Sequence, residues 1–262
     1  MKKPSLIALL TDFGDTDAYV ASMKAVILSI APTASIVDIT HNIPPQEVRQ
    51  ASYQLWTVYK YFPKGTIFLC VVDPEVGSLR KIICVESDDH IFLAPDNGLL
   101  TYVLRYCKVL RVVEVLNSKY FQPTISSTFH GRDIFAPVAA HLSKLMDISN
   151  LGPGTQPKLL NLDFIELSPR ATGKYNGRII HIDHFGNIVT NILFKRQPTK
   201  SLRLKINRST INSFYCTYSD APANCSFMIM GSTNLLEVSL KNGNASTELR
   251  VKVGQKVLLE IK

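Results

Sequence analysis

The first 150 or so residues alternate between short apolar runs and segments with helical spacing, and this alternation constrains the fold more than any other feature of the chain. Runs typical of β-strands lie at 6–10, 35–39, 66–72, 80–86, 90–93 and 110–115. The segments with the spacing of helices are 17–30, 46–61, 97–106 and 132–145. Strands that alternate with helices predict an α/β layer with a largely parallel sheet.

The pattern changes after residue 150. Residues 151–173 contain three prolines and three glycines. Beyond them the chain holds only short β-like runs, at 177–183, 187–193, 202–206, 210–218, 225–230, 235–240 and 248–261, with no convincing helix. Such a series predicts a small all-β barrel or sandwich. We therefore expect an N-terminal α/β domain at 1–165 and a C-terminal all-β barrel domain at 166–262.

Composition narrows the class of protein. Hydrophobic residues make up 46% of the chain and charged residues 19%, which is enough apolar material for a core and is not a disordered composition. No apolar run is long enough to span a membrane. The start, MKKPSLIALLTDF, mimics a signal peptide, but its apolar stretch stops at Thr11 without a small-residue cleavage site. The five cysteines lack CxxC spacing and predict free thiols in a cytoplasmic protein.

The formal charge of +8 raises the question of a nucleic-acid partner. A nucleic-acid binder usually concentrates its charge in a stripe or tail. Here the basic residues are scattered, and the densest cluster, at 195–205, is modest. The sequence therefore favours a solvated basic face and predicts neither a nucleic-acid nor a membrane partner.

Polar side chains gather in the loops that follow the predicted strands, where ligands bind in open α/β sheets. Asp12 follows the first strand, Asp73 and Arg80 lie in VVDPEVGSLR after the third, and His130 lies in STFHGRDIFAP. A permanent cation, an orienting carboxylate and an imidazole that titrates near neutrality can bind one water and take its proton. The structural alternative is that Asp12 forms a turn or caps a helix and that Asp73, before Pro74, caps a turn. No glycine-rich phosphate-binding motif occurs, so the sequence shows no evident binding site for the phosphates of NAD or ATP.

Seven motifs, in chain order, together resemble one family: LTDFGDTDAYV, DITHNIPP, VVDPEVGSLR, APDNGLL, STFHGRDIFAPVAAHL, IDHFGNIVTNI and GSTNLLEV. The family is that of the S-adenosyl-L-methionine (SAM) hydroxide adenosyltransferases, SAM hydrolases related to the fluorinase and chlorinase. The resemblance covers nearly the whole chain. It implies an N-terminal α/β domain, a C-terminal β-barrel and a homotrimer that binds SAM between neighbouring subunits. It also implies hydrolysis of SAM to adenosine and L-methionine, with SAM as substrate, no cofactor and no metal.

The same resemblance implies roles for individual residues. Water activation falls to Asp73, Arg80 and His130, and Asp12 matches the aspartate that accepts both ribose hydroxyls. The remaining matches are substrate contacts in the second domain: Asp183, Phe185, Asn187, Ser232 and Glu237.

Two departures from the family pattern bear on these roles. Glu75 stands where the family usually has glycine, and it would be strained if that position required a positive φ. Asn234 and Leu235 replace a more usual Gly-Tyr pair after the serine. Three alternatives remain open: a halogenase, which the charged set disfavours; a SAM or adenosine sensor, favoured if Glu75 blocks the water; and an RNA-binding β-barrel, disfavoured because no aromatic and basic stripe is evident.

Overall fold

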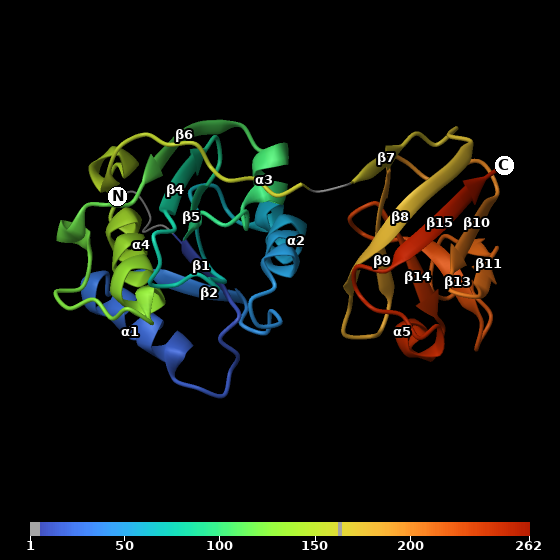
Figure 1. Ribbon diagram of the computed structural model, residues 1–262, viewed down its shortest axis with the longest axis horizontal. Helices are drawn as coiled ribbons and strands as arrows, with labels where there is room; N and C mark the ends of the chain where they lie inside the picture. The colour runs from blue at the N-terminus through green and yellow to red at the C-terminus, as the bar shows by residue number, and fades with distance from the viewer. Residues whose placement is uncertain (1–5, 162–163) are drawn as a thin grey trace. The chain divides into compact units, whose positions relative to one another are not determined.

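The computed structural model describes residues 6–161 and 164–262 (Figure 1). The chain divides into two compact units, Met1–Leu162 and Asp163–Lys262. Each unit has its own sheet and its own hydrophobic core.

The N-terminal unit is built on a six-stranded sheet with the order β2-β1-β3-β5-β4-β6. Its strands are β1 (Leu6–Thr11), β2 (Ser35–Thr40), β3 (Ile67–Val71), β4 (Ile82–Ser87), β5 (Ile91–Pro95) and β6 (Val109–Glu114). The pairs β1–β2, β1–β3 and β3–β5 are parallel, and β4 is antiparallel to both β5 and β6. The predicted largely parallel sheet is therefore confirmed.

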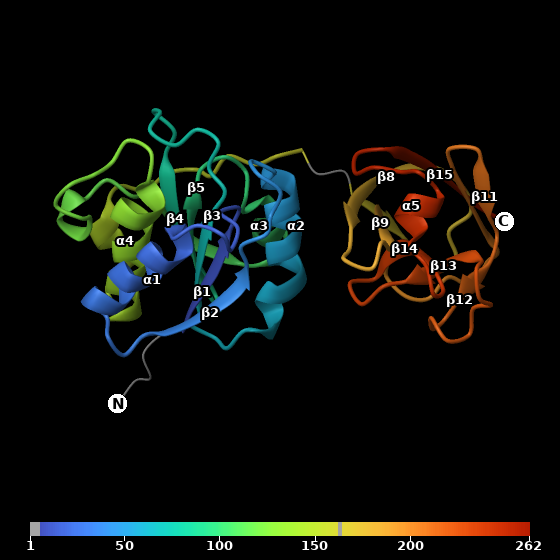
Figure 2. The same cartoon turned by 90° about the horizontal axis from the view of Figure 1, so that it is seen from below.

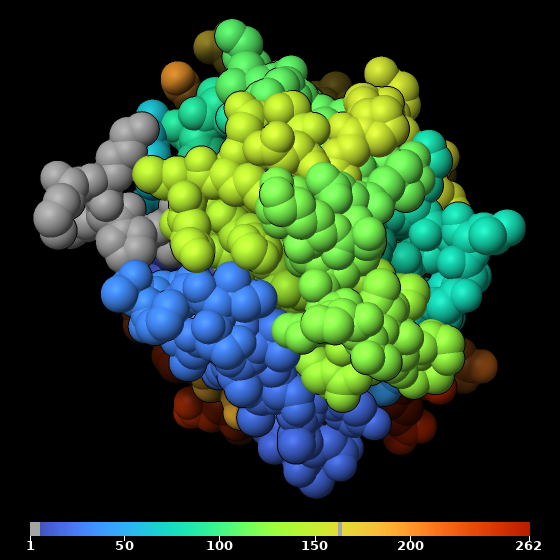
Figure 3. Space-filling view, turned by 90° about the vertical axis from the view of Figure 1, so that its left-hand side faces the viewer, coloured from blue at the N-terminus to red at the C-terminus, as the bar shows by residue number. Residues whose placement is uncertain are grey.

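Helices cover both faces of this sheet (Figure 1). They are α1 (Tyr19–Ile30), α2 (Val48–Val58), α3 (Thr101–Tyr106) and α4 (Ala136–Ser143), with a π-helical turn, Gly131–Phe135, leading into α4. Met23 and Ile27 of α1, one helical turn apart, pack into a core that also contains Ile7 and Val138. Figure 3 shows the blue surface of the α1 region beside the yellow-green surface of the α4 region.

The C-terminal unit is a nine-stranded sheet of mostly antiparallel strands that curls into a half-barrel (Figure 2). Along it run β11 (Ser209–Ile211), β10 (Leu202–Ile206), β15 (Lys256–Ile261), β8 (Gly173–Ile182), β9 (Ile188–Phe194), β14 (Leu235–Leu240), β13 (Ser226–Met230) and β12 (Phe214–Tyr215). The ninth strand, β7 (Ile165–Leu167), pairs with β9. Alternate residues of β10 and β15 are buried, which fits a sheet with one face on a core.

The expectation that this unit has no helix was wrong, and so were the bounds of two predicted strands. The run 248–261 is not one strand, because helix α5 (Ala245–Glu248) precedes it and β15 begins only at Lys256. Asn244 starts α5 by accepting a hydrogen bond from the amide of Thr247 at 2.8 Å, an N-cap that apolar patterning does not reveal. The run 210–218 splits into β11 and β12, and β7 was not predicted at all.

Among the helices of the described residues, none is long and apolar enough to cross a membrane.

Candidate active site

Asp73, Arg80 and His130 form one connected group at the carboxyl edge of the N-terminal sheet. Asp73 follows β3, and Arg80 precedes β4, which runs the opposite way and so begins at the same edge. The Arg80 Nε donates to both carboxylate oxygens of Asp73 at 2.9 Å, and Nη2 donates to Oδ2 as well. The side chains of Arg80 and Asp73 are only 6% and 5% exposed, so this ion pair is screened little by water.

His130 completes the group through Arg80. The Arg80 Nη2 lies 2.9 Å from Nδ1 of His130. A guanidinium has donors only, so Nδ1 accepts, and the neutral ring carries its proton on Nε2. Arg80 thus fixes the tautomer of His130, while Asp73 fixes Arg80. The family resemblance implied that these three residues act together, and the structure adds the order in which they are connected.

The surroundings of His130 favour its neutral form. Burial and the neighbouring Arg80 cation lower the pKa of His130, and the carboxylates of Asp73 and Asp133 offset this only in part. Asp133 is itself held by Arg132, whose Nε donates to its Oδ1 at 2.6 Å. It anchors the preceding loop by accepting from the amide of Ser126 at 2.8 Å.

Asp12 lies on the same pocket and is held from a neighbouring loop. Its Oδ2 accepts a hydrogen bond from the backbone amide of Gln46 at 2.8 Å. Burial raises the pKa of Asp12, the Gln46 amide acts against this, and the charge of Asp73 adds to the rise. Gln46 has a φ of 66°, a left-handed conformation that is uncommon outside glycine. Sequence reasoning missed Gln46, although the preceding Pro44-Pro45 marks a turn.

The pocket around Asp12 and His130 has a volume of about 540 Å³. Arg80 does not line it but contacts His130 and Asp73, which do. Aromatic side chains form part of the wall: Phe13, Tyr19 and Phe129 contact one another with ring centroids 5.1 to 5.9 Å apart. The full lining consists of Asp12, Phe13, Tyr19, Pro45, Gln46, Val71, Asp73, Pro74, Val76, Thr128, Phe129, His130 and Gly131. The site therefore offers apolar surface as well as charge.

The C-terminal unit carries a second pocket, of about 670 Å³, built around the turn between β8 and β9. Oδ1 of Asp183 accepts from the amides of Phe185 and Asn187 at 3.0 and 2.8 Å, and the Asn187 Nδ2 donates to Oδ2 at 2.8 Å. Phe185 is 74% exposed, which is unusual for phenylalanine. Tyr218 and Lys241 also line this pocket and were not predicted.

Neither of the predicted residues Glu237 and Ser232 lines this pocket, although Glu237 contacts Tyr218, which does. The Tyr218 hydroxyl is 3.4 Å from Oε2 of Glu237. Burial and, less strongly, the charge of Asp183 raise the pKa of Glu237 to about 7, with the Tyr218 hydroxyl acting against them. Ser232 is exposed on the turn between β13 and β14. The carboxylate of Glu237 packs against Gly231, where a Cβ would come within 1.8 Å of Oε1, so Glu237 lies beside the residue that precedes Ser232.

Neither departure from the family pattern distorts the backbone. Glu75 is exposed, is not one of the residues with positive φ, and does not line the pocket; the positive φ of its loop belongs to Gly77. Glu75 is therefore unstrained in its place. Asn234 has a φ of 63° and closes the β13–β14 turn by donating to the Gly231 carbonyl at 2.9 Å. Asparagine tolerates this conformation better than most residues.

Within the described ranges, no three His, Cys, Asp or Glu side chains gather as a candidate metal site.

The fold and site together are those of an enzyme with a buried charged group at the edge of its sheet. Family models for the N-terminal and C-terminal domains of SAM hydroxide adenosyltransferases match residues 7–152 and 177–258. The chain belongs to the SAM hydroxide adenosyltransferase family.

Individual proteins agree with this family. The (R)-S-adenosyl-L-methionine hydrolase of Salinispora arenicola (strain CNS-205) is 33% identical over 96% of each chain. The fluorinase of Actinoplanes sp. (strain N902-109) is 28% identical over 71% of each chain. A solved structure of an uncharacterized conserved protein from Thermotoga maritima superposes with a TM-score of 0.88 at 35% identity, covering 97% of this chain and 99% of that one.

Proposed function

We propose that this protein hydrolyses S-adenosyl-L-methionine to adenosine and L-methionine. The observation that carries the proposal is the connected Asp73–Arg80–His130 group beside Asp12 on one pocket. Full-length relatives named (R)-S-adenosyl-L-methionine hydrolase support the same substrate.

The reaction needs a nucleophile more than it needs a leaving group. The positive sulfur of SAM already makes C5′ of the ribose electrophilic. In the proposed step, the oxygen of water bonds to C5′ as the C5′–S bond breaks. The electron pair of that bond goes to sulfur, which becomes the thioether of methionine. One proton of the water is released, so the protein has to hold water in line and favour its hydroxide character.

Asp73, Arg80 and His130 supply these conditions in our proposal. The unprotonated Nδ1 of His130 is the basic nitrogen of the neutral ring, and its lowered pKa keeps it free of a proton near neutrality. Nδ1 has one lone pair, which Arg80 occupies, so in this proposal a water displaces the Arg80 N–H from Nδ1 and then has both a base and a cation beside it. The ring then takes the proton while the guanidinium stabilises the hydroxide.

The other candidate residues bind the substrate in this proposal. Asp12 accepts the ribose hydroxyls, which a carboxylate with an oxygen already oriented by Gln46 can do. Asp183 contacts the methionine end, and Asn187 and the exposed ring of Phe185 contact the adenosine. Ser232 and Glu237 complete the substrate contacts. SAM itself is the substrate, and the proposed chemistry uses no cofactor.

Product analysis tests the proposal. Purified protein is incubated separately with the (R) and (S) sulfonium epimers of SAM, in buffers with and without chloride or fluoride, and the products are separated by chromatography. We expect adenosine and methionine in equal amounts. A 5′-halogenated nucleoside would identify a halogenase instead, and tight binding of SAM without turnover would identify a sensor.

The assembly belongs to the same proposal. The resemblance implies a homotrimer in which each SAM contacts residues of two subunits, and we propose this arrangement here. The test mixes His130→Ala chains with Asn187→Ala chains and measures activity after the subunits have exchanged. Activity above that of either variant alone is expected, because some sites then contain neither substitution. Sites formed by single chains would gain nothing from mixing, and a monomer in light scattering would also contradict the arrangement.

We also propose that the protein acts in the cytoplasm. Cys70 and Cys84 are buried free thiols, and Cys216 and Cys225 are exposed free thiols, which suits a reducing compartment.

A further inference from the structure

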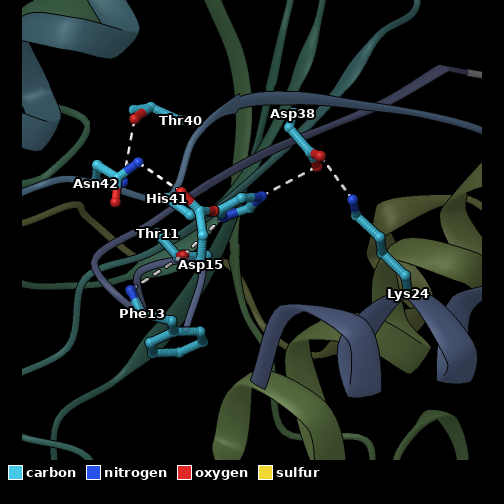
Figure 4. Close-up of polar contacts among 8 residues, drawn as sticks. All are labelled: Thr11, Phe13, Asp15, Lys24, Asp38, Thr40, His41 and Asn42. Carbon is cyan, nitrogen blue, oxygen red and sulfur yellow. Dashed lines mark hydrogen bonds and ion pairs between the residues drawn. The ribbon is translucent and has the colours of Figure 1, made fainter. Parts of the chain in front are cut away.

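His41 connects the two loops that follow β1 and β2 (Figure 4). Its Nδ1 lies 2.9 Å from Oγ1 of Thr11, the residue immediately before Asp12. Its Nε2 lies 3.0 Å from Oδ1 of Asp38 in β2. Its backbone carbonyl accepts a hydrogen bond from the amide of Gly14 at 2.8 Å. The imidazole is only 5% exposed and Thr11 is fully buried, whereas the Asp38 side chain is 41% exposed.

Each ring nitrogen of His41 has a partner on a different strand. Oγ1 of Thr11 accepts a hydrogen bond from the amide of Phe13 at 3.3 Å and is also hydrogen-bonded to Nδ1 of His41. Nε2 of His41 is in ion-pair contact with Asp38, which also accepts from Nζ of Lys24 at 2.6 Å. Burial raises the pKa of Asp38, but Lys24 and His41 outweigh burial and lower it. The contacts at both ring nitrogens therefore fix the orientation of the imidazole.

Two more contacts join the same pair of loops around Asp12. The Nδ2 of Asn42 donates to Oδ2 of Asp15 at 2.7 Å, and the amide of Gln46 donates to Oδ2 of Asp12 at 2.8 Å (Figure 4 shows the first). The position of Asp12 is therefore fixed in two ways. Its backbone follows directly from the residue that His41 holds, and one of its carboxylate oxygens is fixed by the loop that continues from His41.

We propose that His41 is a positioning residue for ribose recognition: it holds the β1 loop so that the Asp12 carboxylate meets the ribose hydroxyls. The inference rests on the proposed role of Asp12. His41 itself does not line the pocket and contacts no reacting atom. A binding carboxylate must be held within a fraction of an ångström, which a buried hydrogen-bonded support achieves and an unsupported loop does not.

The test separates ribose recognition from general loosening of the fold. Calorimetry measures the binding of adenosine and of 2′,3′-dideoxyadenosine, which lacks both hydroxyls, to the full-length protein. Thr11→Val keeps the shape of the buried side chain but removes the hydroxyl that pairs with His41, and Thr11→Ser keeps the hydroxyl. His41→Leu removes the ring. The matched control is His141→Leu, because His141 lies on α4 and does not line the pocket.

Wild-type protein is expected to bind adenosine roughly tenfold or more tightly than the dideoxynucleoside. Thr11→Val and His41→Leu should lose most of this preference, by weakening adenosine alone, whereas Thr11→Ser and His141→Leu should retain it. In steady-state assays with SAM the first two variants should raise KM more than they lower kcat.

Equal weakening of both nucleosides by Thr11→Val would overturn the inference and leave Asp12 in its role. A wild-type protein that binds both nucleosides equally would overturn the ribose role of Asp12, and this inference with it, while product analysis would still decide whether SAM is cleaved. If His41→Leu does not fold, the comparison of Thr11→Val with Thr11→Ser decides.

Discussion

Gly77 lies so close to Ser127 that a Cβ at residue 77 would stand 2.4 Å from the Ser127 carbonyl oxygen. Gly77 also has a φ of 80°, so glycine is required here for two independent reasons. This contact joins the loop that carries Asp73 and Arg80 to the loop that ends at His130. The close approach of two backbones therefore sets the distance over which Arg80 reaches His130.

Gly77→Ala should separate the two loops. The added methyl meets a backbone oxygen, which cannot turn aside as a side chain can, so we expect destabilisation of roughly 1–3 kcal/mol and a marked fall in kcat. Gly65→Ala is the matched control, because Gly65 has a φ of 84° and no atom lies within 4 Å of the place that its methyl group would occupy. It should lose stability from backbone strain and keep its kcat. Equal kcat values in the two variants would show that the Gly77 contact does not position the site.

Substitutions of His130 distinguish a base from a hydrogen-bond donor. His130→Ala should lower kcat by about 10²-fold or more, because a lost general base acts in the transition state. Glutamine keeps a polar side chain that can donate but cannot act as a base near neutrality. If His130 is the base, His130→Gln should be as inactive as His130→Ala. Substantial activity in His130→Gln would instead assign the ring a donor role from Nε2.

The pH dependence of kcat should follow the lowered pKa of His130. The neutral ring is the active form, so kcat should hold its plateau to below pH 6.5, the ordinary imidazole value, and fall only under the lowered pKa. The fold disfavours protonation of His130, so the pKa of this residue is lower in the folded protein than in the unfolded chain. Its contribution to the free energy of unfolding is therefore complete above the unfolded pKa and is lost as pH falls. NMR titration of the ring in Arg80→Gln should show a higher pKa than in wild type. An unchanged value would remove Arg80 as a cause.

Glu237 should give a separate pH dependence, in KM. Its carboxyl has a pKa raised to about 7, so it gains its negative charge as pH rises through this value. SAM carries a net positive charge, and we expect its KM to rise as pH falls through about 7. Glu237→Gln should abolish this dependence and leave that of kcat in place. A KM profile in Glu237→Gln that matches wild type would exclude Glu237 from substrate binding.

The sequence was sufficient for the sheet and for the residues at its edge. Apolar runs predicted the six strands of the first unit, although the run 80–86 began the fourth strand at Arg80, which lies in the loop before β4. The meeting of Arg80 with His130, 50 residues apart, could not be derived from spacing. It depends on the Gly77–Ser127 contact, which brings together two loops whose paths the sequence does not reveal.

The roles of Gln46 and His41 were not predicted from the sequence. Gln46 donates a hydrogen bond to Asp12 from its backbone amide, a group that every residue except proline has. The identity of residue 46 therefore does not indicate this role. The sequence context of His41 indicates no more than a structural histidine. Its importance follows from the burial of the ring between partners on different strands, the buried Thr11 and the more exposed Asp38.

The origin of the 5′ oxygen tests water attack most directly. The reaction is run with SAM in ¹⁸O-enriched water, and adenosine and methionine are analysed by mass spectrometry. Attack of water on C5′ predicts one ¹⁸O atom in the 5′-hydroxyl of adenosine, at the enrichment of the solvent, and none in methionine within the time of the assay. Adenosine that forms without the label, or a 5′-substituted nucleoside in its place, would contradict water as the nucleophile.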